Sequence, residues 1–203
     1  MFGRQTLAWA RQRPIAKTAQ AAFPPVSVIP TPWSGRKYFL DKMTLRELVW
    51  AYLTYPAIQA YVVLAVDPVA FPEALPRMLA LLGSAVSLAA HAHVVNDVYD
   101  LRSDQAAGKA NGLAGISPAH RVVLRFLLVA GGIAPWLFVP LRAISIVVLA
   151  GLAVIPMLYS APPVRLKERG FLGLATDAIL VHMLPTLFIA SLFLGAEADR
   201  GGA

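Results

Sequence analysis

Five apolar stretches, separated by short polar segments, follow one another along most of this chain. About 20 mainly apolar residues cross a bilayer core as a helix. The pattern predicts spans at residues 45–66, 77–98, 120–139, 142–159 and 172–196, within a domain covering residues 44–196. We therefore expect an all-α, multispanning transmembrane helix bundle of about five spans.

Local signals at the ends of these stretches agree with helices. Thr44 and Glu47 have the spacing of a capping box, in which both side chains satisfy backbone donors of a first helical turn. Ser117 followed by Pro118 combines a favourable N-cap with a residue suited to the first turn. The second span is rich in Gly, Ala and Ser, whose small side chains let helices approach closely in lipid.

Composition supports a membrane protein. The 203 residues are 58% hydrophobic and 14% charged, with a mean hydropathy of +0.62, whereas a soluble domain has about 25% charged residues. The absence of cysteine excludes disulfides and thiolate metal sites. The net charge of +7 lies at the ends of apolar segments rather than in one basic stripe, so we expect no nucleic-acid partner.

Basic residues alternate along the chain. They gather before the first span and in the loops after the second and fourth spans, whereas the other two loops and the tail hold only Arg77, Arg142 and Arg200. The positive-inside rule then predicts an integral, multi-pass protein with a cytoplasmic amino terminus, in a bacterial inner membrane or an organelle membrane. Residues 1–43 form a basic, proline-containing leader, expected to be poorly ordered or to act as a transit peptide. Residues 197–203 form a short polar tail.

A polar stretch ends the second span. In a helix continued that far, Asn96, Asp97, Asp100 and Asp104 point to roughly 0°, 100°, 40° and 80° and so share one face. Carboxylate and amide oxygens are ligands that Mg²⁺ favours. This spacing predicts a Mg²⁺ site at the end of the span. His93 lies on the same arc, but we interpret it as a hydrogen-bonded interior histidine, and His91 points about 160° away.

Two cytoplasmic loops then carry the expected chemistry. Lys109 follows the acidic stretch, and Arg165 and Lys167 follow the fourth span. Mg²⁺ on one side and these cations on the other would suit a diphosphate. Arg169 is equally consistent with a role in this site and with a basic residue that only reflects membrane topology. Asp177 in the fifth span is a functional candidate or a partner of a neighbouring helix.

Both stretches resemble motifs of one family. Residues 96–104 resemble the NDxxDxxxD motif of the UbiA family of intramembrane prenyltransferases, and residues 159–167 resemble its YSxPPxRxK segment. The resemblance implies the amino-terminal half of a UbiA-like bundle that transfers a polyprenyl group from its diphosphate to an aromatic or other lipophilic acceptor. It implies that Asn96, Asp97, Asp100 and Asp104 hold Mg²⁺, the three aspartates being catalytic, and that Asn96, Lys109, Tyr159, Arg165 and Lys167 bind the diphosphate.

The sequence departs from the family pattern in one respect. Family members have a second motif, DxxxD, on a later loop, and after Asp104 no further DxxxD occurs in these 203 residues. The alternative expectation is therefore a catalytically inactive membrane subunit or remnant that keeps the first diphosphate half-site, with a second chain supplying further helices. A soluble helical prenyl synthase also uses aspartates and Mg²⁺, but five apolar spans argue against it.

Overall fold

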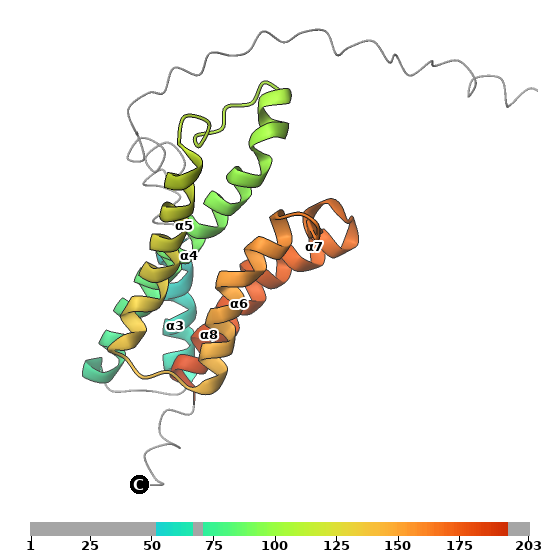
Figure 1. Ribbon diagram of the computed structural model, residues 1–203. Coiled ribbons are helices and arrows are strands. Elements are labelled where there is room, and N and C mark those ends of the chain that lie inside the picture. Colours follow the sequence, from blue (N-terminus) through green and yellow to red (C-terminus); the bar gives the residue numbers. More distant parts are fainter. Residues whose placement is uncertain (1–51, 67–70, 195–203) are drawn as a thin grey trace, which may run out of the picture.

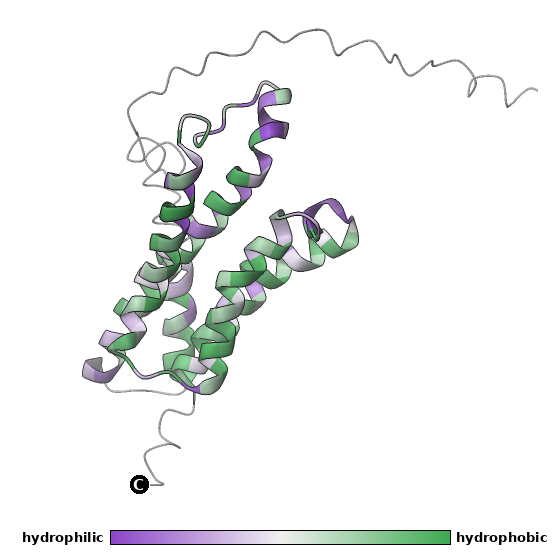
Figure 2. Cartoon of the chain, in the orientation of Figure 1, coloured by the Kyte–Doolittle hydropathy of each residue, from purple (hydrophilic) through white to green (hydrophobic). Residues whose placement is uncertain are grey.

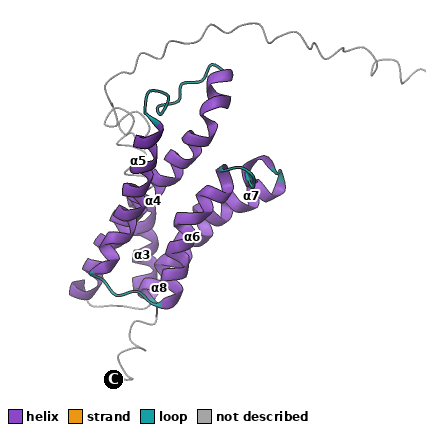
Figure 3. Cartoon of the chain, viewed as in Figure 1, coloured by secondary structure: helices purple, strands orange, loops and turns teal. Residues whose placement is uncertain are grey.

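The computed structural model describes residues 52–66 and 71–194, and within these ranges the chain is an all-α bundle (Figures 1 and 3). Its helices are α3 (Tyr55–Val66), α4 (Phe71–Ala106), α5 (Pro118–Ile133), α6 (Ala143–Ser160), α7 (Phe171–Ala178) and α8 (Leu184–Phe193). Short turns η2 (Ala134–Leu137), η3 (Leu166–Glu168) and the π-helical η4 (Ile179–Met183) join or extend them. The expected leader, the Thr44–Glu47 capping box and the tail lie outside the described residues.

Four helical runs are long and apolar enough to cross a membrane: Pro72–Ala106, Pro118–Leu137, Ala143–Ser160 and Phe171–Phe193. The run Tyr52–Val66 is apolar but shorter within the described residues. The expected all-α, multispanning fold is therefore confirmed. Hydropathy is uneven along the bundle. The carboxyl-terminal end of α4 and the turn around η3 are hydrophilic, whereas the helix bodies are mainly apolar (Figure 2).

Helix α4 is the central element. It packs against α3, α5, α6 and α8. Its 36 residues extend beyond the expected span at both ends. It begins at Phe71 rather than near Arg77. Pro76 is tolerated because it lies near the helix start, where its missing N–H removes only one hydrogen bond, to the carbonyl of Pro72. It ends at Ala106, so the acidic stretch remains helical through Asp104.

Close contact between α4 and α5 rests on small residues. Gly132 of α5 lies so near Leu88 that an added Cβ would be 2.7 Å from Leu88 Cγ. Ser84 donates its hydroxyl hydrogen to the Gly132 carbonyl at 2.6 Å and accepts from Trp136 Nε1 at 2.7 Å. The Trp136 ring meets Phe188 of α8 edge to face at 5.2 Å. These contacts hold α4, η2 and α8 together at the end of the bundle away from the acidic stretch.

The amino terminus of α5 is as the sequence predicts. Ser117 is its N-cap and accepts a hydrogen bond from the His120 N–H at 3.3 Å, and Pro118 occupies the first turn. Helix α6 begins after Arg142 and stays continuous through Pro156. In the fifth run the helix widens into η4 just before Pro185. A π-turn shifts the hydrogen-bond register ahead of a proline that has no N–H to donate.

Candidate functional site

The hydrophilic end of α4 meets the turn that follows α6. Lys167 Nζ donates to Asn96 Oδ1 at 2.9 Å and lies 2.6 Å from both carboxylate oxygens of Asp100. Arg165 Nη2 donates to Asp100 Oδ1 at 3.1 Å. Two stretches more than 60 residues apart in the sequence therefore meet at one end of the bundle. Four of the expected site residues are thus joined through their side chains: Asn96, Asp100, Arg165 and Lys167.

The backbone after α6 places the two cations. Ser160 at the helix end donates its hydroxyl hydrogen to Asn96 Oδ1 at 3.3 Å, and a cis peptide joins Pro162 to Pro163. Arg165 then adopts a left-handed conformation, with φ 39° and ψ 59°, and its N–H donates to the Ala161 carbonyl at 2.8 Å. This conformation costs a non-glycine residue about 1–2 kcal/mol. The closed turn, together with the contacts of its cations to Asp100, offsets that cost.

The ion pairs are shielded from solvent. The side chains of Lys167 and Asp100 are 13% and 19% exposed, and that of Arg165 is 25% exposed. Arg165 Nε lies 2.8 Å from Glu168 Oε1, but its N–H is not directed at that oxygen. Partial burial strengthens these pairs relative to surface ion pairs, which contribute at most about 1 kcal/mol. Two cations thus share the single carboxylate of Asp100, an arrangement suited to receiving a further anionic group.

The loop after α4 contains a residue that the sequence analysis missed. Asn111 is 9% exposed, and its Nδ2 donates to the Asp97 carbonyl and to Asp104 Oδ2, each at 2.9 Å. Its Oδ1 accepts the Leu113 N–H at 3.0 Å. Asn111 therefore ties the loop to the acidic stretch at two points about two helical turns apart. The Asn111-Gly112 pair signals a turn, but the sequence does not indicate that the turn folds back onto α4.

The remaining expected residues lie around this contact. Asp97 is buried, with 5% of its surface exposed. The Lys109 side chain is exposed and forms no ion pair with a described carboxylate, although its N–H donates to the Asp104 carbonyl at 2.8 Å. Tyr159 is half-buried in α6, near enough to Asp100 and Asp177 to interact with both charges. Asp177 is exposed on α7.

The acidic stretch offers the kind of ligand atoms that Mg²⁺ needs, but not their grouping. Asn96, Asp97, Asp100 and Asp104 offer oxygen donors only, which fits this ion chemically. Within residues 52–66 and 71–194, however, no three carboxylate or imidazole side chains lie close enough together to hold one metal. Asp100 is paired with Lys167, and Asp104 with Asn111. A cation at this site would therefore compete with Lys167 for Asp100.

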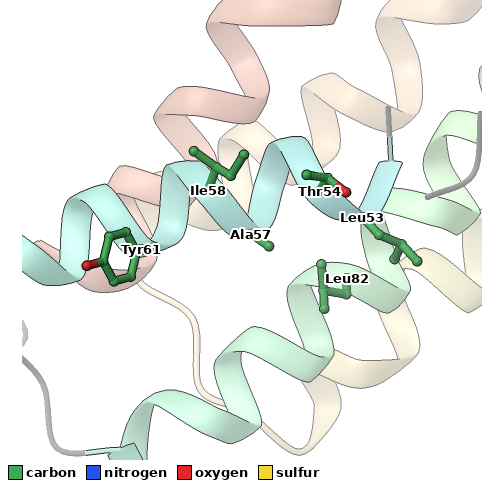
Figure 4. Close-up of a pocket in the computed structure, with 6 residues that line it drawn as sticks. All are labelled: Leu53, Thr54, Ala57, Ile58, Tyr61 and Leu82. Carbon is green, nitrogen blue, oxygen red and sulfur yellow. The ribbon is translucent and has the colours of Figure 1, made fainter. Parts of the chain in front are cut away.

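The two histidines of α4 serve different neighbours. His91 Nε2 lies 3.2 Å from the Ala153 carbonyl of α6, whereas His93 Nε2 is hydrogen-bonded to the Tyr52 hydroxyl. His93 is therefore hydrogen-bonded, as expected, but it is exposed rather than interior. An open hollow lies between α3 and α4 (Figure 4). Its lining is mainly apolar and lacks the residues of the acidic and basic stretches: Leu53, Thr54, Ala57, Ile58, Tyr61 and Leu82.

Over the described residues, the protein belongs to the class of all-helical bundles with helices long and apolar enough to cross a membrane, and its acidic and basic stretches meet at one end of the bundle. The chain matches no family model, no curated protein and no solved structure. Any narrower assignment therefore depends on the residues of the site.

Proposed function

We propose that this chain is a UbiA-like prenyltransferase, which transfers a polyprenyl group from its diphosphate to a lipophilic acceptor within the membrane in a Mg²⁺-dependent reaction. One observation carries the proposal. Asn96 and Asp100 of the NDxxDxxxD-like stretch contact Lys167 and Arg165 of the YSxPPxRxK-like stretch. The two stretches that resemble family motifs thus converge on one another, as a shared diphosphate site requires.

The proposed reaction needs positive charge close to the departing diphosphate, because negative charge develops on that group as its bond to carbon breaks. The allylic C–O bond breaks, and both electrons of that bond leave with the diphosphate oxygen. The acceptor supplies the electron pair of the new bond and releases a proton to solvent. Arg165 and Lys167 are positioned to hold the departing diphosphate through charge-assisted hydrogen bonds. To hold Mg²⁺, the oxygens of Asn96, Asp97, Asp100 and Asp104 would have to come closer together than they lie in this structure, and the ion would then add positive charge at the same leaving group.

The position of the ion-paired site, where polar loops meet apolar helices, also favours the proposed reaction. An allylic cation is captured by water unless the site excludes it. Below the ion pairs, α4 continues into a body whose buried residues include Val94, Val95 and Ala90. A polyprenyl chain would leave the polar end and enter this apolar environment, while its diphosphate remains among the cations.

The test measures release of diphosphate from labelled geranylgeranyl diphosphate by the full chain in lipid nanodiscs with Mg²⁺. We expect Asp97→Asn to reduce release at least a hundredfold, because it removes a charged oxygen donor at constant shape. Lys167→Met should weaken binding of the diphosphate at least tenfold. Glu73→Gln, at the opposite end of α4, is the matched control and should retain full release.

A second candidate is a diphosphate-binding membrane subunit without catalytic activity. The pairing of both Asp100 oxygens with Lys167 favours it, because the carboxylate is already neutralised. Tight, Lys167-dependent binding of the diphosphate with no release above background would support this candidate and contradict the transferase.

A further inference from the structure

Two arginines of helix α5 lie on one face of the helix, near the polar end of the bundle. Arg121 and Arg125 differ by four residues, so they are about 40° apart around the helix and about 6 Å apart along its axis. Both residues are half-buried rather than exposed. Because helical side chains lean toward the amino terminus of their helix, both arginines lean toward the polar end, where α5 begins at Pro118.

Neither arginine has a good anionic partner. Nε of Arg121 and Nε of Arg125 are both buried and have no hydrogen-bond partner. Nη2 of Arg125 donates to the Met157 sulfur of α6 at 2.8 Å, and a thioether is a weak acceptor. Within residues 52–66 and 71–194, no carboxylate lies within ion-pairing distance of either guanidinium group. Two half-buried cations therefore lack a counter-charge in the described part of the chain.

This arrangement is unfavourable for the chain alone. Taking a cation out of water without a paired anion is costly, and like charges four residues apart on a helix repel each other. The amino-terminal end of a helix also carries a partial positive charge, which repels Arg121. The Tyr99 ring, whose centroid lies 5.9 Å from Cζ of Arg125, offers only a weak attraction. A bound anion would offset all of these costs.

The two arginines are separate from the proposed diphosphate site. Arg165 and Lys167 contact Asp100, whereas neither arginine of α5 forms an ion pair with that carboxylate. Arg125 instead approaches Tyr99, which points about 100° away from Asp100 around α4, and it also reaches α6. The α5 arginines therefore form a second cationic group, on another side of α4.

The surroundings favour a lipid as the source of the anion. Val122 and Phe126 directly follow the two arginines in the sequence and are 63% and 72% exposed. They belong to a helical run long and apolar enough to cross a membrane, so acyl chains would meet these side chains. Basic residues between membrane helices near the cytoplasmic surface are typical of sites for acidic lipid headgroups, and the planar guanidinium group matches the geometry of a phosphate.

We propose that Arg121 and Arg125 bind the phosphate of an anionic phospholipid, whose acyl chains lie along Val122 and Phe126. The guanidinium N–H groups donate charge-assisted hydrogen bonds to the phosphate oxygens. A headgroup without a positive charge is preferred, because two arginines would repel the ammonium group of a zwitterionic lipid. This site does not depend on the transferase activity proposed above.

The experiment measures binding of dioleoylphosphatidylglycerol and of dioleoylphosphatidylcholine to the full chain in detergent by native mass spectrometry. We expect wild type to bind the phosphatidylglycerol at least tenfold more tightly than the phosphatidylcholine. Arg121→Gln and Arg125→Gln should each weaken phosphatidylglycerol binding about tenfold, the loss of one charge-assisted hydrogen bond. Arg102→Gln is the matched control and should leave binding unchanged, because it removes the same charge from an exposed position near the same end of the bundle.

Thermal unfolding in detergent separates a ligand site from a structural role. Without lipid, neither α5 variant should lower the unfolding midpoint, because each replaces a half-buried cation that lacks a counter-charge. Phosphatidylglycerol should raise the midpoint of wild type and of Arg102→Gln, but much less that of either α5 variant. A lowered midpoint without lipid, together with unchanged phosphatidylglycerol binding, would mean that the arginines only join α5 to α4 and α6, and would overturn the proposal.

Three further outcomes would also overturn it. Equal weakening by Arg102→Gln would reveal non-specific attraction to a basic surface. Inorganic phosphate that displaces phosphatidylglycerol and stabilises the chain as strongly would identify a site for soluble phosphate rather than for a lipid. Equal weakening by Lys167→Met and Arg121→Gln would place the lipid phosphate in the diphosphate site. By contrast, absence of diphosphate release with intact, Arg121-dependent lipid binding would contradict only the transferase and would support the lipid site.

Discussion

Asn111 connects the loop after α4 to two turns of the acidic stretch, through the Asp97 carbonyl and the Asp104 carboxylate. Asn111→Ala removes three hydrogen bonds from a buried position, and we expect a loss of about 1–3 kcal/mol in the free energy of unfolding. Asn111→Asp would place a second carboxylate against Asp104. This variant keeps an oxygen that can accept the Leu113 N–H. At neutral pH it should still be less stable than Asn111→Ala, because carboxylate repulsion at this buried position outweighs the one hydrogen bond that is retained.

The pH dependence separates repulsion from lost hydrogen bonding. Acidification protonates the introduced carboxylate and relieves the repulsion, so Asn111→Asp should gain stability relative to Asn111→Ala as the pH falls from 7 toward about 4. Thermal unfolding of both variants in detergent across this pH range is the measurement. A constant difference between the variants would contradict the proposed proximity of residue 111 to the Asp104 carboxylate.

At the scale of elements, the contact between α4 and α5 depends on the missing side chain of Gly132. In Gly132→Ala the new methyl would lie 2.7 Å from Leu88 Cγ and 2.8 Å from its Cδ2, so the leucine must move. We expect a loss of about 1–3 kcal/mol from overpacking. Gly83→Ala is the matched control, because its Cβ would meet Pro135 Cγ at an ordinary 3.9 Å. There, Ala should be neutral or stabilising, since it is the better helix former.

The measurement is the unfolding midpoint of each variant in detergent, combined with a double-mutant cycle against Leu88→Ala. If the clash with Leu88 is the cause, the two substitutions should be less than additive, because the shortened side chain makes room for the methyl. Strict additivity, or destabilisation by Gly83→Ala as large as that by Gly132→Ala, would contradict this explanation.

The elements differ in how far the sequence determines them. Apolar length predicts the helices, because a bilayer core fixes how many residues must be apolar, and Ser117 marks the start of α5 correctly. Helical periodicity also places Asn96 and Asp100 on one face, toward Lys167. Contacts between side chains on different elements cannot be predicted in this way. The bonds of Asn111 and the hydrogen bond from Gln59 of α3 to Thr186 of α8 depend on how loops and helices fold together, which no local pattern encodes.

At the scale of the whole molecule, the described polar loops lie at one end of the bundle. The acidic end of α4 and the turn around η3 meet there, whereas Arg77 and Arg142 contact the Leu192 and Leu194 carbonyls near the other end of α8. The ends of the bundle therefore differ in polarity. The positive-inside rule predicts that the end with both loops faces the cytoplasm.

The chain contains no cysteine, so single introduced cysteines report this orientation without background. Gln105→Cys and Glu168→Cys lie at exposed positions of the polar end, and Pro140→Cys lies in the exposed loop at the opposite end. We expect a membrane-impermeant maleimide to label positions 105 and 168 only from the cytoplasmic face, and position 140 only from the other face. Labelling of 105 and 168 from opposite faces would separate Asp100 from Lys167 by a membrane and remove the basis of a shared diphosphate site. Labelling of both from the outer face would keep the site but reverse the predicted topology, because the basic loops would then lie against the positive-inside bias.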